Sequence, residues 1–152
     1  MREKDTFTQY FREAQVGFSR FFAVILTQAG LTLPQYALLN QLALSGSIPM
    51  TEASKQLRIT KPAVTHLVDR LEKNKYLKRL SHPKDRRIFL LEIQPKGLSL
   101  VRTVQSQVLD ILLKALSQFS DQDQKTITQF YAALVQHLAA IPNKPKIEKN
   151  VS

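Results

Sequence analysis

Residues 60–73 read TKPAVTHLVDRLEK, and the fold of the chain can be worked out from this segment. Its apolar residues recur every three or four positions, which is the spacing of an amphipathic helix; they are Val64, Leu67, Val68 and Leu71. Thr60 or Lys61 is expected to cap the helix, with Pro62 in its first turn, where the missing N–H costs nothing. The segment therefore predicts a helix that ends near Asn74 and has one buried and one exposed face.

A second, shorter helix is predicted just before this one. Ser45, Gly46 and Ser47 are expected to break the chain, Thr51 precedes a helix over about Glu52–Leu57, and Arg58–Thr60 connects it to the next helix. Two short helices joined by a turn of three or four residues form a helix-turn-helix, whose second helix enters the major groove of DNA. The exposed face of that second helix offers polar and charged side chains, namely Lys61, Thr65, His66, Asp69, Arg70 and Lys73.

A β-hairpin is predicted after the helix pair. Tyr76–Leu80 and Ile88–Ile93 are short runs of β-branched, aromatic and leucine residues, and the polar, basic loop Ser81–Arg87 separates them. Because a two-stranded hairpin is only marginally stable alone, it must pack against the helices before it. A helix pair followed by such a hairpin is a winged helix.

Longer amphipathic helices are predicted on both sides of this unit. They cover about Asp5–Ala29, about Pro34–Leu44 with Thr32 as its N-cap, the stretch after Pro95-Lys96-Gly97, and a last stretch after the N-cap Ser120. The first of these helices and the last two are long and apolar and lie outside the winged helix, so we expect these three to mediate dimerisation. Residues 142–152 are rich in proline and polar residues, which predicts a flexible tail. The expected fold is mainly α-helical with a small β-hairpin wing: a winged helix-turn-helix flanked by long N- and C-terminal dimerisation helices.

The positive charge of the chain is concentrated in one segment. Of the net charge of +10, Thr60–Gly97 carries +6, from ten basic and four acidic residues, whereas residues 1–59 and 98–152 each hold six basic and four acidic residues. An excess of this kind favours polyanionic partners. Although charged residues usually form a solvated face, this concentration favours contact with phosphates.

The composition also limits the classes of function. The chain has no cysteine, which excludes disulfides, thiolate metal sites and a thiol redox switch. The apolar run Phe21–Leu26 is far shorter than a bilayer span and residues 1–10 are charged, so we expect a soluble, cytoplasmic protein. Four glycines without a phosphate-binding loop, and no nucleophile motif, argue against an enzyme and a cofactor. The three histidines lie on separate elements without ligand spacing, so no metal site is expected.

In their order and spacing, these motifs resemble the MarR family of winged helix-turn-helix regulators. Residues 62–73 look like the recognition helix, Asp85-Arg86-Arg87 like the Asp-x-Arg wing signature, and residues 93–97 like the junction Leu-Thr-x-Lys-Gly. The resemblance covers nearly the whole chain. It implies a single MarR-like domain over 1–141, with a DNA-binding winged-helix lobe at about 32–95 and a helical dimerisation region at 5–29 and 96–141.

The sequence departs from the family pattern at three positions. His66 stands where the family commonly has Arg, so the preferred base is open. Lys75 stands where Gly commonly ends the recognition helix, and Asn74 is therefore expected to adopt the left-handed turn. Gln94 replaces Thr, which affects the capping of the helix that follows.

The resemblance implies a sequence-specific regulator that binds double-stranded DNA as a homodimer, acts as a repressor, and contacts an inverted repeat with half-sites about ten base pairs apart. The expected DNA-binding residues are Lys61, Pro62, Ala63, Thr65, His66, Arg70, Lys73, Lys84, Asp85, Arg86 and Arg87. Arg87 is the leading candidate for the minor groove, with Asp85 orienting it. A turn residue that closes the loop explains Asp85 equally well.

Family members often bind small aromatic or anionic effectors, and by this resemblance four aromatic residues could line an effector pocket: Phe11, Phe18, Phe22 and Tyr36. Ordinary core packing explains the same residues. The alternative to a DNA-binding regulator is a winged-helix module that binds RNA or a protein partner.

Overall fold

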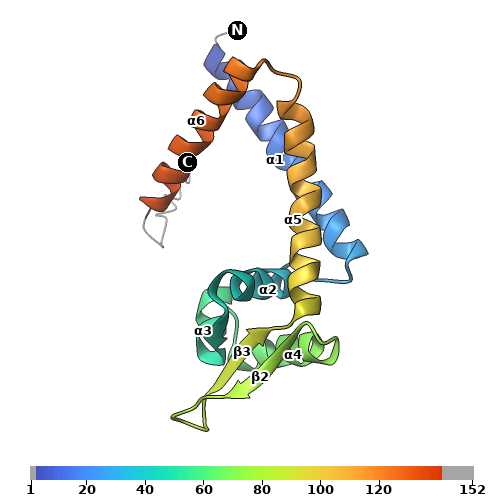
Figure 1. Ribbon diagram of the computed structural model, residues 1–152, viewed down its shortest axis with the longest axis vertical. Coiled ribbons are helices and arrows are strands. Elements are labelled where there is room, and N and C mark those ends of the chain that lie inside the picture. The colour runs from blue at the N-terminus through green and yellow to red at the C-terminus, as the bar shows by residue number, and fades with distance from the viewer. Residues whose placement is uncertain (1–2, 142–152) are drawn as a thin grey trace, which may run out of the picture. The chain divides into compact units, whose positions relative to one another are not determined.

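The computed structural model describes residues 3–141 (Figure 1). In chain order the elements are α1 (Glu3–Gln28), α2 (Leu33–Ser45), β1 (Ser47–Pro49), α3 (Met50–Leu57), α4 (Lys61–Lys73), β2 (Leu77–Ser81), β3 (Phe89–Ile93), α5 (Pro95–Leu116) and α6 (Asp121–Ala139). Every predicted helix and strand is present within a few residues, and β1 is an addition. The predicted flexible tail, residues 142–152, lies outside the described residues.

Hydroxyl side chains fix where three of the helices begin. Thr32 and Gln35 form a capping box before α2, in which Thr32 Oγ1 accepts from the Gln35 backbone N–H (3.4 Å) and Gln35 Oε1 accepts from the Thr32 N–H (2.9 Å). Thr60 Oγ1 accepts from Ala63 N at 3.3 Å, so Thr60 is the N-cap of α4. Ser120 caps α6, as predicted.

The wing is part of a three-stranded antiparallel sheet with the order β1-β3-β2. In the central strand β3, Leu91 pairs with Ile48 of β1 on one side and with Arg79 of β2 on the other. The sequence did not predict β1, because a strand of three residues is too short to show an alternating pattern. Pairing with β1 ties the hairpin to the helices, which supplies the support that an isolated hairpin lacks.

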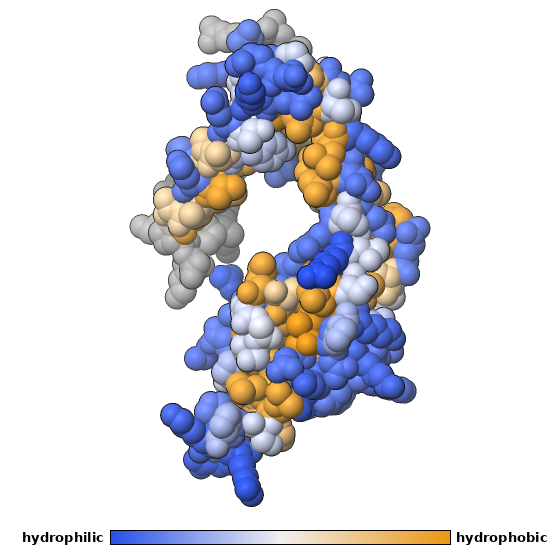
Figure 2. Space-filling model, in the orientation of Figure 1, coloured by the Kyte–Doolittle hydropathy of each residue, from blue (hydrophilic) through white to orange (hydrophobic). Residues whose placement is uncertain are grey.

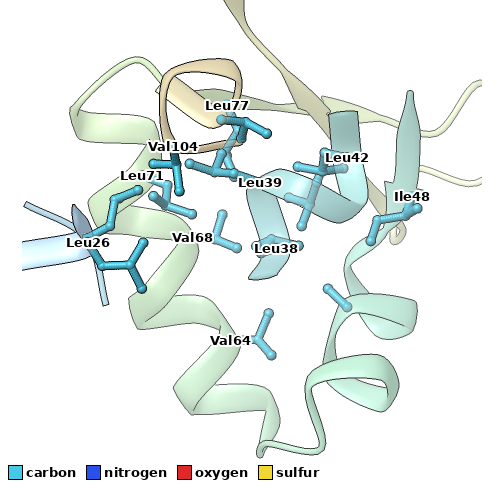
Figure 3. Packing of buried hydrophobic residues seen from close by; sticks show 14 of the residues in the cluster. Leu26, Leu38, Leu39, Leu42, Ile48, Val64, Val68, Leu71, Leu77 and Val104 are labelled. Carbon is cyan, nitrogen blue, oxygen red and sulfur yellow. The ribbon is translucent and has the colours of Figure 1, made fainter. Parts of the chain in front are cut away.

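The core of the winged-helix lobe forms around α2 (Figure 3). Leu38, Leu39 and Leu42 of α2 are at most 1% exposed. They pack with buried residues of α4 and the sheet: Val64, Val68, Leu71, Leu77 and Leu91. Because three residues on one side of α4 are buried, the opposite side of this helix must face solvent.

Two compact units divide the chain, Met1–Leu109 and Asp110–Ser152. In the second unit, α6 has no buried residue. Its exposed large apolar side chains are Phe130, Tyr131, Leu134, Val135 and Leu138. No single described helix is long and apolar enough to cross a membrane, although α1 and α2, bent by 87°, pass that test as a pair.

Candidate nucleic-acid interface

The outward face of α4 carries the side chains that the sequence predicted for DNA contact. Seven predicted α4 residues are all exposed: Lys61, Pro62, Ala63, Thr65, His66, Arg70 and Lys73. The buried residues Val64, Val68 and Leu71 hold the other face against the core. The face is therefore set by packing, because any rotation of α4 about its axis would expose apolar side chains.

Thr65 is oriented by a bond within its own helix. Its hydroxyl donates to the Lys61 carbonyl oxygen at 3.0 Å. Since the single hydroxyl proton is used in this way, the Thr65 oxygen presents acceptor lone pairs to a ligand. It is suited to accept a hydrogen bond from a donor such as an amino group.

The tip of the wing is strongly hydrophilic (Figure 2) and holds the other four predicted residues. Lys84, Arg86 and Arg87 are exposed and Asp85 is partly buried. Asp85 Oδ1 accepts from Arg87 N at 3.0 Å and from Arg87 Nε at 3.2 Å, and its Oδ2 accepts from Nη2 at 3.3 Å. The hydrogen bonds from the Arg87 side chain and then from its backbone lower the pKa of Asp85 below 3.8. Asp85 thus closes the turn and also holds the Arg87 side chain, which is 91% exposed.

Further hydrogen bonds give the wing loop a defined shape. The His82 N–H donates to the Ile88 carbonyl at 3.0 Å, and the Ile88 N–H donates to the Asp85 carbonyl at 3.0 Å. His82 Nδ1 accepts from the Lys84 backbone N–H at 3.2 Å. Because these bonds cross the loop, the two arginines extend from a closed turn.

A cavity of about 230 Å³ lies where α3, the start of α4 and the wing meet. Its wall includes three predicted DNA-binding residues, Lys61, Thr65 and Arg87. The fold therefore brings residues from both predicted elements to one depression. Other residues of its wall were not predicted, among them Thr51 and Ser54 of α3, because no local pattern marks them.

Sequence reasoning also missed a contact between the sheet and α4. Arg79 of β2 donates from Nη1 to Glu72 Oε2 and from Nη2 to Asp69 Oδ1, both at 2.5 Å. Nη2 also donates to the Thr65 carbonyl at 3.5 Å, and the Arg79 backbone N–H donates to Glu72 Oε1 at 3.1 Å. The acids at 69 and 72 are visible in the sequence, but their arginine partner depends on how the strand is placed.

The end of α4 differs from the prediction. Lys75 itself adopts the left-handed conformation, with φ of 62°, whereas Asn74 stays helical with φ of −82°. Asn74 is held in the helix because its backbone N–H and its Nδ2 both donate to the Arg70 carbonyl. The chain then turns at Lys75, whose N–H donates to the Glu72 carbonyl at 2.9 Å.

The start of α5 is fastened to this turn. Lys96 Nζ donates to the Asn74 carbonyl at 3.1 Å and lies 4.9 Å from the centre of the Tyr76 ring. Gly97 is buried, and a Cβ placed on it would lie 2.1 Å from the Tyr76 carbonyl oxygen. Only glycine fits here without movement of the backbone, which gives a physical reason for the Lys-Gly pair at this junction.

The four aromatic residues predicted for an effector pocket have different surroundings. Phe22 and Tyr36 meet edge to face at a centroid distance of 5.1 Å, and burial raises the pKa of Tyr36 above 10.0. Phe18 is partly buried. Phe11 stacks on Phe7 and is 52% exposed. Phe22 and Tyr36 are thus brought together, and Phe11 lies about three helical turns away along α1.

Among the described residues, no group of three or more His, Asp or Glu side chains could hold a metal ion.

Comparison with known proteins agrees with this architecture. The model of the MarR family matches residues 31–89. The chain is 28% identical over 99 residues to the uncharacterized HTH-type transcriptional regulator YsmB of Bacillus subtilis, a match that covers 65% of this chain and 68% of YsmB. The transcriptional regulator Tm0710 from Thermotoga maritima is similar in structure, with a TM-score of 0.75 and 27% identity over 89% of this chain and 95% of that one. A mutant of S. aureus MepR, bound to an oligodeoxyribonucleotide, shares the fold, with a TM-score of 0.71 and 21% identity over 87% of this chain and 97% of that one.

Proposed function

The chain belongs to the MarR family of winged helix-turn-helix transcriptional regulators, and we therefore propose that it binds double-stranded DNA through α4 and the wing. The observation that carries this proposal is the outward face of α4, held by the core beside an arginine-tipped wing. The MepR mutant, which has the same fold, is seen bound to an oligodeoxyribonucleotide. The segment Thr60–Gly97, which includes both elements, carries +6 of the net charge of +10.

Different residues of α4 take different roles in this proposal. The N-terminal part of a recognition helix lies closest to base edges, so Thr65 and His66 contact bases and Ala63 or Pro62 contacts a thymine methyl. Lys61, Arg70 and Lys73 neutralise phosphates, which positions the helix without reading sequence.

The wing contributes a second contact, in the minor groove. Arg87 enters the narrow groove of A·T-rich DNA, where the negative potential attracts a guanidinium. Lys84 and Arg86 bind the flanking phosphates. The Asp85 carboxylate orients Arg87 through the bonds to Nε and Nη2.

The regulator acts as a homodimer in this proposal. Apolar faces support it: α6 buries none of its residues in a single chain, and α1 exposes Phe7, Tyr10 and Phe11. Exposed apolar faces on two long helices are typical of surfaces that are covered in an assembly. A two-fold dimer places two recognition helices in successive major grooves, so the operator is an inverted repeat with half-sites about ten base pairs apart.

Repression follows if such an operator overlaps a promoter, because the bound dimer excludes the polymerase. Release by a small aromatic or anionic effector is the finer part of the proposal, and it rests on the resemblance to the family; of the four aromatic residues expected to line a pocket, Phe22 and Tyr36 are in contact. Isothermal titration with 4-hydroxyphenylacetate, which a ligand-bound relative of the same fold holds, tests this part, and no heat of binding would remove it.

Selection from a randomised duplex library tests the proposal. The purified chain should enrich A·T-rich inverted repeats, and light scattering should give twice the mass of one chain. A gel shift with the selected duplex, challenged by structured RNA as competitor, separates DNA binding from RNA binding. Enrichment of no sequence, or displacement by RNA at equal concentration, would overturn it.

A further inference from the structure

One arginine of the wing sheet joins the recognition helix along two turns. The guanidinium of Arg79 bonds to Thr65, Asp69 and Glu72 of α4. These positions are four and three residues apart, so they form one row along the helix. A single side chain anchored in β2 therefore holds two turns of α4.

The backbone of Arg79 takes part in the same contact. Its N–H donates to Glu72 Oε1, so Glu72 receives one bond from the backbone and one from the side chain of the same residue. Arg79 lies opposite the buried Leu91 in the sheet register, and only 19% of its side chain is exposed. The arginine is thus fixed at its base by the sheet and at its tip by the helix.

We propose that Arg79 is a positioning residue for DNA recognition. It holds α4 and the wing in a fixed relative orientation, so that the two elements contact adjacent grooves of DNA together. This inference rests on the proposed function above. Arg79 touches no DNA in this scheme, because its donors already face α4. It acts through Thr65 and through the orientation of the whole helix.

Arginine suits this task better than lysine. Its planar guanidinium presents donors in a fixed fork, whereas a lysine ammonium is a point charge on a flexible stem. Here Nη1 serves Glu72 while Nη2 serves Asp69, which are separate carboxylates. A lysine at this position could hold one of them firmly and would leave the other free.

The neighbouring strand residue offers a matched control. Lys78 is paired with Glu92 of β3 at 2.9 Å, and successive strand residues point to opposite faces of a sheet. Arg79→Gln and Lys78→Gln therefore remove the same charge one residue apart, but only the first removes the contact with α4.

The test compares specific with non-specific binding. The specific probe is a duplex selected by the wild-type protein from a randomised library, and the non-specific probe is poly(dI-dC). We expect a loss of about threefold for each subunit, the size typical of partly exposed ion pairs, so Arg79→Gln should lower the ratio of specific to non-specific affinity by roughly tenfold in the dimer. Lys78→Gln should weaken both probes equally and leave the ratio unchanged. An equal ratio in the two variants overturns the inference.

Removing the acids from the helix separates positioning from simple charge. The double variant Asp69→Asn, Glu72→Gln keeps Arg79 and makes the face of α4 more positive. If charge alone mattered, both probes would bind more tightly and the ratio would not change. Positioning requires the ratio to fall while poly(dI-dC) binds at least as well as before. The double variant also tests the inference if Arg79→Gln fails to fold.

Rescue provides the last readout. Arg79→Lys should give a ratio of specific to non-specific affinity between those of the wild type and Arg79→Gln, since lysine keeps one of the two ion pairs. If the wild-type protein selects no duplex at all, the proposed function fails, and the inference fails with it. If the wild type selects a duplex and Arg79→Gln keeps the same ratio as Lys78→Gln, the inference alone fails.

Discussion

Arg87 donates to Asp85 from both its backbone nitrogen and its guanidinium, so the arginine at the wing tip is held by the residue two positions before it. The bonds use Nε and Nη2, which leaves the Nη1 side of the guanidinium directed away from Asp85. A planar group fixed along one edge enters a groove with less loss of side-chain entropy than a free one. In the proposed function, the carboxylate therefore orients the arginine before it meets DNA.

Arg87→Ala is expected to weaken binding to the selected duplex and to flatten its dependence on salt. Each lost phosphate or groove contact reduces the slope of log K against log salt by about 1, and a dimer loses two. The measurement is a titration by fluorescence anisotropy between low and moderate salt. An unchanged slope together with unchanged affinity would exclude a role for the wing arginine.

Asp85→Asn separates orientation from charge at the same site. The substitution removes one negative charge from each subunit, so charge alone predicts tighter binding to DNA. Asparagine keeps one acceptor oxygen but replaces the other, which accepts from Arg87 Nη2, with a donor, and the weaker hold on Arg87 predicts weaker binding to the selected duplex. Isothermal titration of the selected duplex with this variant decides between the two, and tighter binding would assign Asp85 to loop closure only.

The acid range provides a direct check on this pair. Because bonds from Arg87 lower the pKa of Asp85 below 3.8, the carboxylate stabilises the wing fully above pH 3.8. That contribution is lost as the pH falls through the lower folded value. A carbon-13 NMR titration should show the Asp85 pKa moving back toward 3.8 in Arg87→Ala, while the backbone N–H still holds it slightly low. An identical pKa in both proteins would contradict the assignment of the shift to the side chain.

His66→Ala is expected to change base preference at one position of each half-site. His66 is exposed in the second turn of α4, where recognition helices approach base edges. Libraries selected by the variant and by wild type would be compared position by position. Lys73→Ala, which removes a proposed phosphate contact at the other end of the helix, should lower affinity for all sequences alike. A uniform loss in His66→Ala would make His66 a phosphate contact too.

The sequence predicted this fold well where local patterns report on packing. The apolar spacing of Val64, Val68 and Leu71 predicts the buried face of α4, and Thr60, one of two predicted caps, is the N-cap found. It did not predict β1, which depends on pairing with β3. Nor did it predict that Arg79 would meet Asp69, because contacts between elements leave no periodic trace in one chain.

The turn after α4 shows how a local rule can lead to the wrong residue. Asn tolerates the left-handed conformation better than Lys, so local preference favours Asn74. In the structure, however, Asn74 continues the helix and Lys75 adopts the positive φ. Asn74 stays helical through its two hydrogen bonds to the Arg70 carbonyl, so the turn falls one residue later, at Lys75.

Lys75→Gly is therefore expected to stabilise the protein. The left-handed conformation costs an L-residue about 1–2 kcal/mol, and glycine relieves this cost. The greater freedom of glycine in the unfolded chain offsets part of the relief, so the free energy of unfolding should rise by roughly 0.5–1 kcal/mol. Urea unfolding at fixed protein concentration measures the difference. Lys73→Gly, at the last residue of α4, should destabilise by up to about 1 kcal/mol, because glycine is a poor helix former. The same sign in both variants would contradict the conformational explanation.

Gly97→Ala tests the close approach between α5 and the turn after α4. A Cβ at position 97 would lie 2.1 Å from the Tyr76 carbonyl oxygen and 2.9 Å from its carbonyl carbon, and both belong to backbone that is also bonded to Gln94. Relief of this clash requires the helix and the turn to separate, which should cost about 1–3 kcal/mol, as in other overpacked sites.

Gly17→Ala is the matched control, because nothing lies within 4 Å of a Cβ there and the residue is inside α1. It should stabilise by about 0.5–1 kcal/mol, since alanine favours the helix. Opposite effects of one methyl group at two helical glycines, measured by urea unfolding, would place the cost of Gly97→Ala in the contact with Tyr76. Equal effects would mean that the backbone at Tyr76 yields freely.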